Sequence, residues 1–274
     1  MSATTTHSPK AVIFDAYGTL FDVHSVIAAA EQMFPGHGDA LSQLWRQKQI
    51  EYTQLRTLAA PAATPGAHYR PFWDITLDAL RFAAKKLQLT LGRTAEKRLM
   101  DEYACLSAFP DAVPALRLLR LSRGESLTSQ ASASGESASR ARLAILSNGN
   151  PQMLDVAVKS AGMTGLFDHV LSVDAVRAYK PSPAAYALGT QTFDAEPREI
   201  VFVSSNGWDV AGAAWFGFTT FWLNRQNAPA EELGVTPHGA GGGMTDLLAF
   251  LKTLASPGRT SGSGGSRTRH SPGA

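Results

Sequence analysis

Cysteine and long apolar runs are both scarce in this chain. Its single cysteine, Cys105, cannot form an intrachain disulfide. No window approaches the roughly 18 to 20 uninterrupted apolar residues of a membrane-spanning helix. The opening segment, MSATTTHSPK, has no apolar core of the kind that a signal peptide needs. These features argue against a disulfide scaffold, a membrane protein and a secreted protein, and they predict a cytoplasmic location.

A surplus of charge of either sign is also missing. The 25 Lys and Arg residues nearly balance the 23 Asp and Glu residues, for a net charge of +2, and no dense basic stretch occurs. We therefore expect neither nucleic acid nor a membrane surface as a partner, and a small molecule is the better expectation. Hydrophobic residues make up 44% of the 274 positions, which is enough for the core of one large domain or two modest ones.

Short apolar runs rich in Val, Ile and Phe recur along the chain. Most lack the alternation of a strand with one face in water, so they predict strands buried on both faces. These runs cover residues 11–14, 142–147, 169–173, 199–205 and 219–223. Helical stretches lie between them, and Pro151 and Pro183 mark two helix starts. The alternation predicts an α/β fold with a Rossmann-like, doubly wound parallel sheet, whose ligand site lies at the carboxyl ends of the strands.

One long interruption breaks this alternation. Four helical segments and no strand occupy residues 23–105, which predicts a helical cap domain inserted after the first strand. The predicted core domain then comprises residues 11–22 and 106–255. A serine-rich stretch at 122–140 predicts a flexible insertion in that core. We also expect a flexible N-terminus over residues 1–10 and a disordered tail over 256–274.

Polar residues stand at the ends of several predicted strands. Asp15 follows the first strand, Ser147 ends the second, and Ser204 lies in the run at 199–205. Each alone has an ordinary structural explanation, because Asp, Ser and Asn commonly end strands and cap helices. A parallel sheet would bring them to one edge, however, where they could act together.

In this order, these motifs resemble those of the haloacid dehalogenase superfamily, and most closely its type II L-2-haloacid dehalogenases. The matching segments are FDAYGTLFDVHSV, LWRQKQIEYTQLR, LAILSNGNP, LSVDAVRAYKP and VFVSSNGWDVAGAAWFGFTTFWLNR. The resemblance covers roughly residues 11 to 225. It implies a hydrolase that acts on carbon–halogen bonds, and it suggests a homodimer.

Two positions depart from the magnesium-dependent phosphatases of that superfamily. Tyr17 stands where those enzymes have an acid that protonates the leaving group, and halide needs no such proton. Ser205 stands where they have an aspartate that helps to hold the metal, and its loss removes a hard oxygen ligand. We therefore expect no metal and no cofactor.

A phosphatase of the same fold and a non-catalytic binding protein are the alternatives; the first would need both missing acids, and the second would be expected to lose the nucleophile or its lysine.

The resemblance implies a displacement in two steps. Asp15 attacks the α-carbon of a short-chain L-2-haloalkanoic acid and forms a covalent ester, and halide leaves. Water then attacks the ester carbonyl carbon, so that the product is a D-2-hydroxy acid. Lys180 is the expected counter-charge of Asp15, and Thr19 the expected hydrogen-bond donor.

The remaining site residues are likewise carried over from the resemblance. Ser147 and Asn148, which precede a helix start, are expected to hold the substrate carboxylate. Ser204, Asn206 and Asp209 are expected to support activation of the hydrolytic water, and Tyr186 to lie near the nucleophile. Arg46 is the expected cation beside the departing halide, although its position off the apolar stripe of its helix would also suit a solvated arginine. The full set of expected substrate-binding residues is Tyr17, Gln47, Phe72, Ser147, Asn148 and Trp208, and the expected partners are a 2-haloacid and the halide product.

Overall fold

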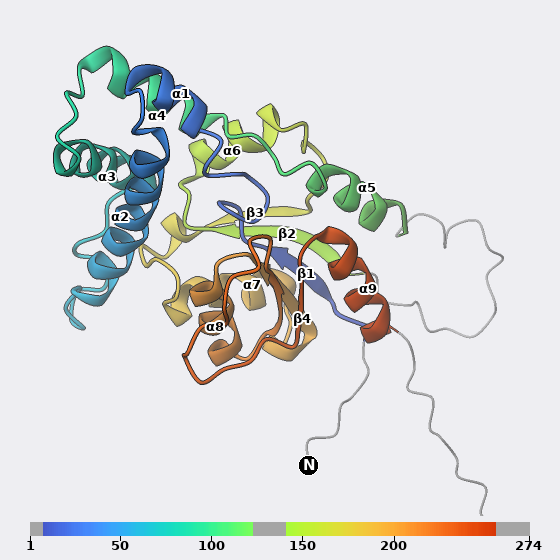
Figure 1. The fold of residues 1–274 in the computed structure, drawn as a ribbon. Helices are drawn as coiled ribbons and strands as arrows, with labels where there is room; N and C mark the ends of the chain where they lie inside the picture. The colour runs from blue at the N-terminus through green and yellow to red at the C-terminus, as the bar shows by residue number, and fades with distance from the viewer. Residues whose placement is uncertain (1–7, 123–140, 256–274) are drawn as a thin grey trace, which may run out of the picture.

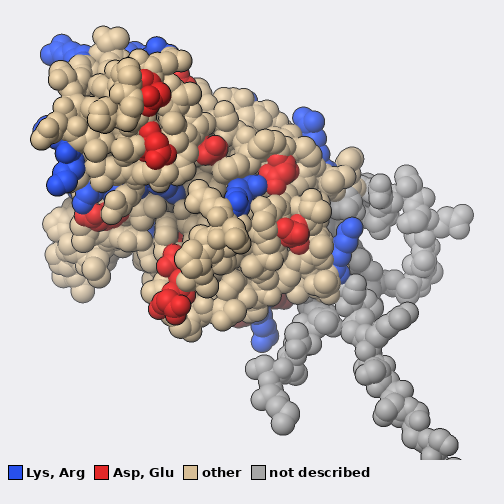
Figure 2. Space-filling model, in the orientation of Figure 1, with Lys and Arg blue, Asp and Glu red and all other residues tan. Residues whose placement is uncertain are grey.

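The computed structural model describes residues 8–122 and 141–255. The flexible segments predicted at 1–10, 122–140 and 256–274 therefore lie almost wholly outside the described residues. Among the described helices, none is both long and apolar enough to cross a membrane. On the face drawn in Figure 2, basic and acidic side chains are interspersed, without a continuous patch of one sign.

A parallel sheet with strand order β3-β2-β1-β4-β5-β6 forms the centre of the fold. Its strands are β1 (Ala11–Phe14), β2 (Arg142–Ser147), β3 (His169–Ser172), β4 (Ile200–Ser204), β5 (Thr219–Leu223) and β6 (Gly239–Gly241). All neighbours pair in parallel, and β1 lies between β2 and β4. The order reverses at β1, so the predicted doubly wound sheet is confirmed and its ligand crevice is expected beside this strand.

Helices cover both faces of the sheet. In Figure 1, α5 (Ala112–Ser122) and α6 (Pro151–Ser160) lie on one side, and α7 (Pro183–Phe193) and α8 (Gly207–Phe216) lie on the other. This arrangement buries β1, β2 and β4 almost completely, as their uninterrupted apolar runs predict. The last helix, α9 (Met244–Ala255), packs beside α5 and β6.

The edges of the sheet differ from the sequence prediction. The run at 169–173 was expected to be buried on both faces, but His169 and Val170 are exposed in β3. That prediction was wrong because β3 is an edge strand and has no neighbour on one side. The opposite edge, β6, was not predicted, since a three-residue strand that contains two glycines has no apolar run to reveal it.

Four helices form a separate group beyond the carboxyl end of β1 (Figure 1). They are α1 (Ile27–Met33), α2 (Gly38–Leu58), α3 (Phe72–Lys86) and α4 (Arg93–Ala104). The chain enters and leaves this group at adjacent points, because Asp22 N donates to Ser107 O at 2.8 Å. Leu41 and Trp45 of α2 and Ile75 of α3 are buried, and Trp45 Nε1 donates to Thr76 O of α3 at 2.7 Å. The four predicted helices are thus present, and their treatment as a separate cap domain remains a prediction.

Candidate active site

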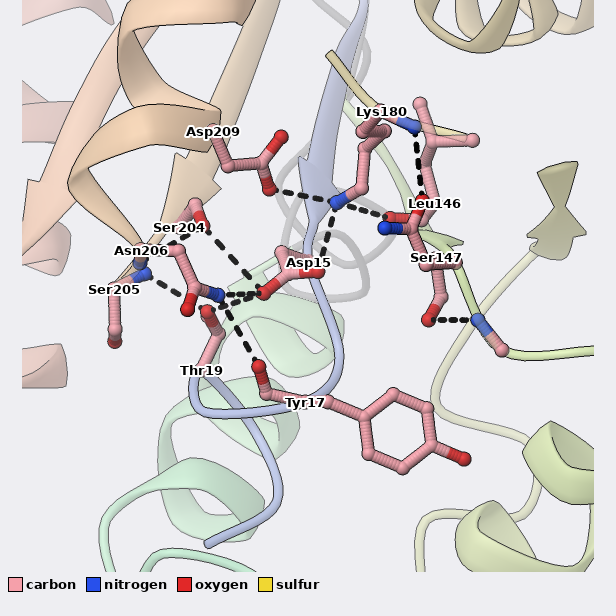
Figure 3. Close-up of polar contacts among 12 residues, drawn as sticks. Asp15, Tyr17, Thr19, Leu146, Ser147, Lys180, Ser204, Ser205, Asn206 and Asp209 are labelled. Carbon is pink, nitrogen blue, oxygen red and sulfur yellow. Dashed lines mark hydrogen bonds and ion pairs between the residues drawn. The ribbon is translucent and has the colours of Figure 1, made fainter. Parts of the chain in front are cut away.

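The polar ends of β1, β2 and β4 meet at one edge of the sheet, as Figure 3 shows. Asp15 follows β1, and its backbone N–H donates to Val203 O of β4 at 2.9 Å, which continues the ladder past the end of the strand. Gly18 then adopts a φ of +93°, in the left-handed region that favours glycine. The turn that results brings Thr19 back beside the Asp15 carboxylate.

The two carboxylate oxygens of Asp15 have different surroundings. Oδ1 accepts a hydrogen bond from Lys180 Nζ at 2.8 Å. Oδ2 accepts from Thr19 Oγ1 at 2.9 Å, from Asn206 Nδ2 at 2.8 Å and, more weakly, from Ser204 Oγ at 3.5 Å. The carboxylate is therefore held on one side by a charge and on the other by neutral donors, and its side chain is 7% exposed.

Lys180 uses all three of its donor positions inside the protein. Besides Asp15, its Nζ contacts Asp209 Oδ2 at 2.6 Å and Leu146 O at 3.2 Å. Burial acts to lower the pKa of Lys180, but the nearby charges of Asp15 and Asp209 outweigh it, so that the pKa is raised overall. The side chain is therefore a fully buried ammonium at neutral pH. This contact places the predicted counter-charge beside the predicted nucleophile.

Asp209 lies in the first turn of α8 and is completely buried. Burial is the largest influence on its pKa and raises it, although the ammonium of Lys180 acts in the opposite direction. Its second oxygen, Oδ1, accepts from Tyr186 OH at 2.7 Å. Tyr186 thus reaches Asp209, and no hydrogen bond to Asp15 is recorded for it in the described structure. Its hydroxyl therefore contacts the carboxylate that also pairs with Lys180.

Thr19 and Asn206 connect the first motif to the last. Thr19 Oγ1 accepts from Ser205 N at 2.8 Å while donating to Asp15. Asn206 N donates to Ser204 Oγ at 3.1 Å, and its side-chain Nδ2 also donates to Tyr17 O at 3.2 Å. These bonds fix the side-chain donors around Asp15 Oδ2, because each donor is held by a second contact.

The helices beyond the sheet contribute a cation to this edge. Arg46 of α2 donates from Nη2 to Tyr17 O at 3.0 Å and to Asn206 Oδ1 at 3.3 Å, and from Nη1 to Gln49 Oε1 at 2.7 Å. The sequence alone would also allow a solvated arginine at this position. The structure instead turns the guanidinium inward, against the loop that carries Asp15.

The ring of Tyr17 points away from the Asp15 carboxylate (Figure 3) and packs against aromatic rings of α3 and α4. Its centroid lies 5.4 Å from that of Phe72 and 5.8 Å from that of Tyr103. Burial raises the pKa of Tyr17 well above its usual value, and the hydroxyl has no hydrogen-bond partner among the described residues. Tyr17 therefore has neither the orientation nor the acidity of a proton donor to a leaving group.

A small pocket lies beside the Asp15 carboxylate. Ser147 and Asn148 reach it from the end of β2, and Trp208 reaches it from α8; the indole Nε1 of Trp208 is buried without a partner in the described part of the chain. The residues that line the pocket are Asp15, Tyr17, Arg46, Ile50, Thr53, Phe72, Ser147, Asn148, Asn206 and Trp208.

Gln47, expected among the substrate-binding residues, is exposed on α2 and does not line this pocket. Its neighbour Arg46 shares a helix face with Ile50 and Thr53 instead, because these lie four and seven residues further along. Ile50, Thr53 and the buried Gln49 were not predicted. The signal for Gln49 was in the sequence, since it continues the apolar spacing of Leu41 and Trp45.

The donor set at this edge does not fit a magnesium ion. The Asp15 and Asp209 carboxylates both turn toward the Lys180 ammonium, at 2.8 and 2.6 Å, so a side-chain cation occupies the position between them. Ser205 supplies no carboxylate, and Tyr17 directs its ring elsewhere. Among residues 8–122 and 141–255, no group of three or more His, Cys, Asp or Glu side chains is arranged to hold a metal.

Comparison with known proteins agrees with this geometry. A family model described as haloacid dehalogenase-like hydrolase matches residues 9–217. The (S)-2-haloacid dehalogenase of Pseudomonas sp. (strain YL) is 44% identical over 246 residues, which cover 90% of this chain and 96% of that protein.

Solved structures give the same result. The L-2-haloacid dehalogenase RSc1362 is 59% identical, with a TM-score of 0.80, over 89% of this chain and 99% of that one. The Xanthobacter autotrophicus L-2-haloacid dehalogenase with chloropropionic acid covalently bound is 35% identical, with a TM-score of 0.75, over 89% of this chain and 98% of that one. The chain is therefore a member of the haloacid dehalogenase-like hydrolases and, within them, of the L-2-haloacid dehalogenase family.

Proposed function

We propose that this protein hydrolyses the carbon–halogen bond of short-chain L-2-haloalkanoic acids and releases halide and a D-2-hydroxy acid. The observation that carries the proposal is the Asp15 carboxylate, which is held by Lys180 on one oxygen and by neutral donors on the other, beside a pocket that Arg46 also lines. The chloropropionic acid bound covalently to the Xanthobacter autotrophicus relative supports an ester intermediate here as well.

The contacts of Asp15 assign different roles to its two oxygens. Oδ1 accepts one hydrogen bond, from Lys180, and keeps a lone pair for attack. Oδ2 already accepts from Thr19 and Asn206 and becomes the carbonyl oxygen of the ester. The same donors are then in place for the negative charge that develops on Oδ2 when water attacks. We therefore assign Oδ1 as the nucleophile.

In the first step, Asp15 Oδ1 forms a bond to the α-carbon from the side opposite the halogen, and the halogen leaves with the bonding electrons. This attack inverts the α-carbon once. Arg46 and the unpartnered Nε1 of Trp208 are the donors available to the departing halide, and Ser147 and Asn148 lie at the pocket wall for the substrate carboxylate. An apolar wall from Phe72 excludes water and strengthens these interactions.

In the second step, water attacks the acyl carbon of Asp15, and the bond from that carbon to the ester oxygen breaks; one proton of the water ends on the departing alkoxide oxygen and the other is released to solvent. The hydroxyl oxygen of the product therefore comes from Asp15, and one carboxylate oxygen of Asp15 comes from water. Asp209 contributes through Lys180, which it holds at 2.6 Å, and Ser204 contributes through its contact with Asn206 N. No step requires a metal ion.

Halide release from L- and D-2-chloropropionate, measured with and without a chelator, tests this proposal. We expect release from the L isomer alone, at the same rate in chelator, and a product of D configuration. Release from the D isomer only, or only with added Mg²⁺, would overturn the proposal. In a single turnover in H₂¹⁸O with excess enzyme, the label should appear in Asp15; label found only in the product would show direct attack by water.

The assembly and the location of the protein are separate proposals. We infer a homodimer on the basis of the family resemblance, and a cytoplasmic location, which the single cysteine of the chain favours. Light scattering on the eluting protein checks the dimer, and a mass equal to one chain of 29.2 kDa would contradict it.

A further inference from the structure

Gln49 is a buried amide that the proposed reaction does not use directly. It lies on α2, three residues after Arg46, and its side chain is fully buried. A buried amide needs partners for both its oxygen and its nitrogen, because each group loses water on burial. Gln49 Oε1 accepts from Arg46 Nη1 at 2.7 Å and from Tyr103 OH at 3.0 Å, and its Nε2 donates to Thr76 Oγ1 at 2.7 Å.

The neighbours of Gln49 determine which end of the amide faces Arg46. Thr76 Oγ1 donates its hydrogen to Phe72 O at 2.7 Å, so its oxygen can only accept from Gln49. The NH₂ end of the amide must therefore face Thr76, and the carbonyl oxygen must face Arg46. The α3 backbone thus fixes the acceptor that holds the guanidinium.

All three hydrogen-bond acceptors of Arg46 are neutral. They are Gln49 Oε1, Tyr17 O and Asn206 Oδ1, and within residues 8–122 and 141–255 no ion pair is recorded for Arg46. A carboxylate in the place of Gln49 would hold the guanidinium equally well but would neutralise its charge. A neutral amide fixes the position of the cation and leaves its charge available to an anion in the pocket.

We propose that Gln49 is a positioning residue for the halide-side cation: it aims the Arg46 guanidinium at the pocket without consuming its charge. This inference rests on the proposed dehalogenase function. It assigns the loss of halide as the step that depends most on Gln49, because Gln49 contacts Arg46 directly, whereas it reaches Asp15 Oδ2 only indirectly, through Arg46 and Asn206.

Two substitutions separate the position of Arg46 from its charge. The Gln49→Met side chain has a similar length but no strong acceptor, so the Arg46 guanidinium loses the hydrogen bond that fixes its position. Gln49→Glu keeps an acceptor but pairs with Arg46. Gln43→Met is the matched control, because Gln43 is exposed on the same helix. Rapid-quench measurement of ester formation and of ester hydrolysis with L-2-chloropropionate, together with the inhibition constant of bromide, reports on each variant.

For both Gln49 variants we expect ester formation to slow by on the order of tenfold to a hundredfold, with weaker bromide inhibition and a smaller effect on ester hydrolysis. In an Arg46→Ala background, Gln49→Met should cause little further loss, because the residue acts through Arg46. Thermal unfolding identifies a variant that has only lost stability, and Gln49→Glu provides the test if Gln49→Met does not fold.

The outcomes separate this inference from the proposed function. If the unmodified protein releases no halide from L-2-chloropropionate, the proposed function fails. If it does release halide, but Gln49→Glu binds bromide and forms the ester as well as the Gln43→Met control, the inference alone is overturned. Full additivity of Gln49→Met with Arg46→Ala would also overturn it.

Discussion

The buried ammonium of Lys180 makes a prediction about stability that can be worked out from distances. Its Nζ lies 2.8 Å from Asp15 Oδ1 and 2.6 Å from Asp209 Oδ2, and the Lys180 and Asp209 side chains have no exposed surface. At an effective dielectric constant of about 20, each contact contributes ~6 kcal/mol of Coulomb energy. Burial of the ions offsets much of this, since desolvation costs several kcal/mol per ion.

Lys180→Met keeps the length of the side chain and removes the charge. It leaves two buried carboxylates near each other without a cation, and removing one partner of a buried pair costs about 3–5 kcal/mol. We therefore expect the free energy of unfolding at pH 7.5 to fall by about 3–5 kcal/mol. Lys159→Met is the control, because Lys159 and Asp155 pair at 2.8 Å with side chains 65% and 59% exposed, and such pairs contribute under about 1 kcal/mol.

The loss of unfolding free energy in Lys180→Met, called the deficit below, should also depend on pH. Burial already raises the pKa of Asp209, and Lys180 is the group that lowers it most, so the variant raises that pKa further. A carboxyl whose pKa is higher in the folded chain stabilises the fold below its unfolded pKa of about 4, and this contribution is lost as the pH rises through the folded pKa. The deficit should therefore be smaller at pH 5 than at pH 7.5.

Urea unfolding followed by tryptophan fluorescence at both pH values measures this deficit. In the unmodified protein, the raised pKa of Lys180 has an effect of the same sign at higher pH: its contribution to stability is present below about pH 10.5 and is lost as the pH rises through the folded pKa. The reasoning would be refuted if Lys180→Met and Lys159→Met unfolded at the same urea concentration at pH 7.5. A deficit of equal size at both pH values would refute it too.

Three further substitutions test individual contacts of the site. Thr19→Val removes the donor to Asp15 Oδ2 and the acceptor of Ser205 N, so we expect the free energy of unfolding to fall by about 2–4 kcal/mol. The substitution should also slow ester hydrolysis more than it slows ester formation. Equal slowing of both steps in a single turnover would contradict the assignment of Oδ2. Arg46→Ala should slow ester formation by on the order of a hundredfold, and unchanged burst kinetics would remove Arg46 from the halide site. Trp208→Phe removes the unpartnered indole N–H of a residue that lines the pocket, so the inhibition constant of bromide should rise about tenfold, and an unchanged constant would show that Nε1 does not contact the halide.

The central strands and their polar ends could be read from contiguous residues. The runs at β1, β2 and β4 are apolar throughout because both faces are covered, and that pattern is visible without coordinates. The order of strands and helices then indicated the parallel sheet, and a parallel sheet places the residues after its strands at one edge. Asp15 and Lys180 are 165 residues apart, and their pairing was expected from the family resemblance and not from the strand pattern alone.

Which way each side chain turns was decided only by tertiary packing. Periodicity shows that Arg46, Ile50 and Thr53 share a helix face, but it does not show that this face is turned to the pocket while Gln47 faces solvent. The partner of Tyr186 likewise depends on how α7 and α8 pack, which directs its hydroxyl to Asp209. A local pattern encodes which residues lie together on one element, whereas the rotation of that element depends on every neighbour it buries. For that reason the residue types and motifs of the site could be read from the sequence and its family resemblance, but not which oxygen of Asp15 each donor contacts, nor the amide that holds Arg46.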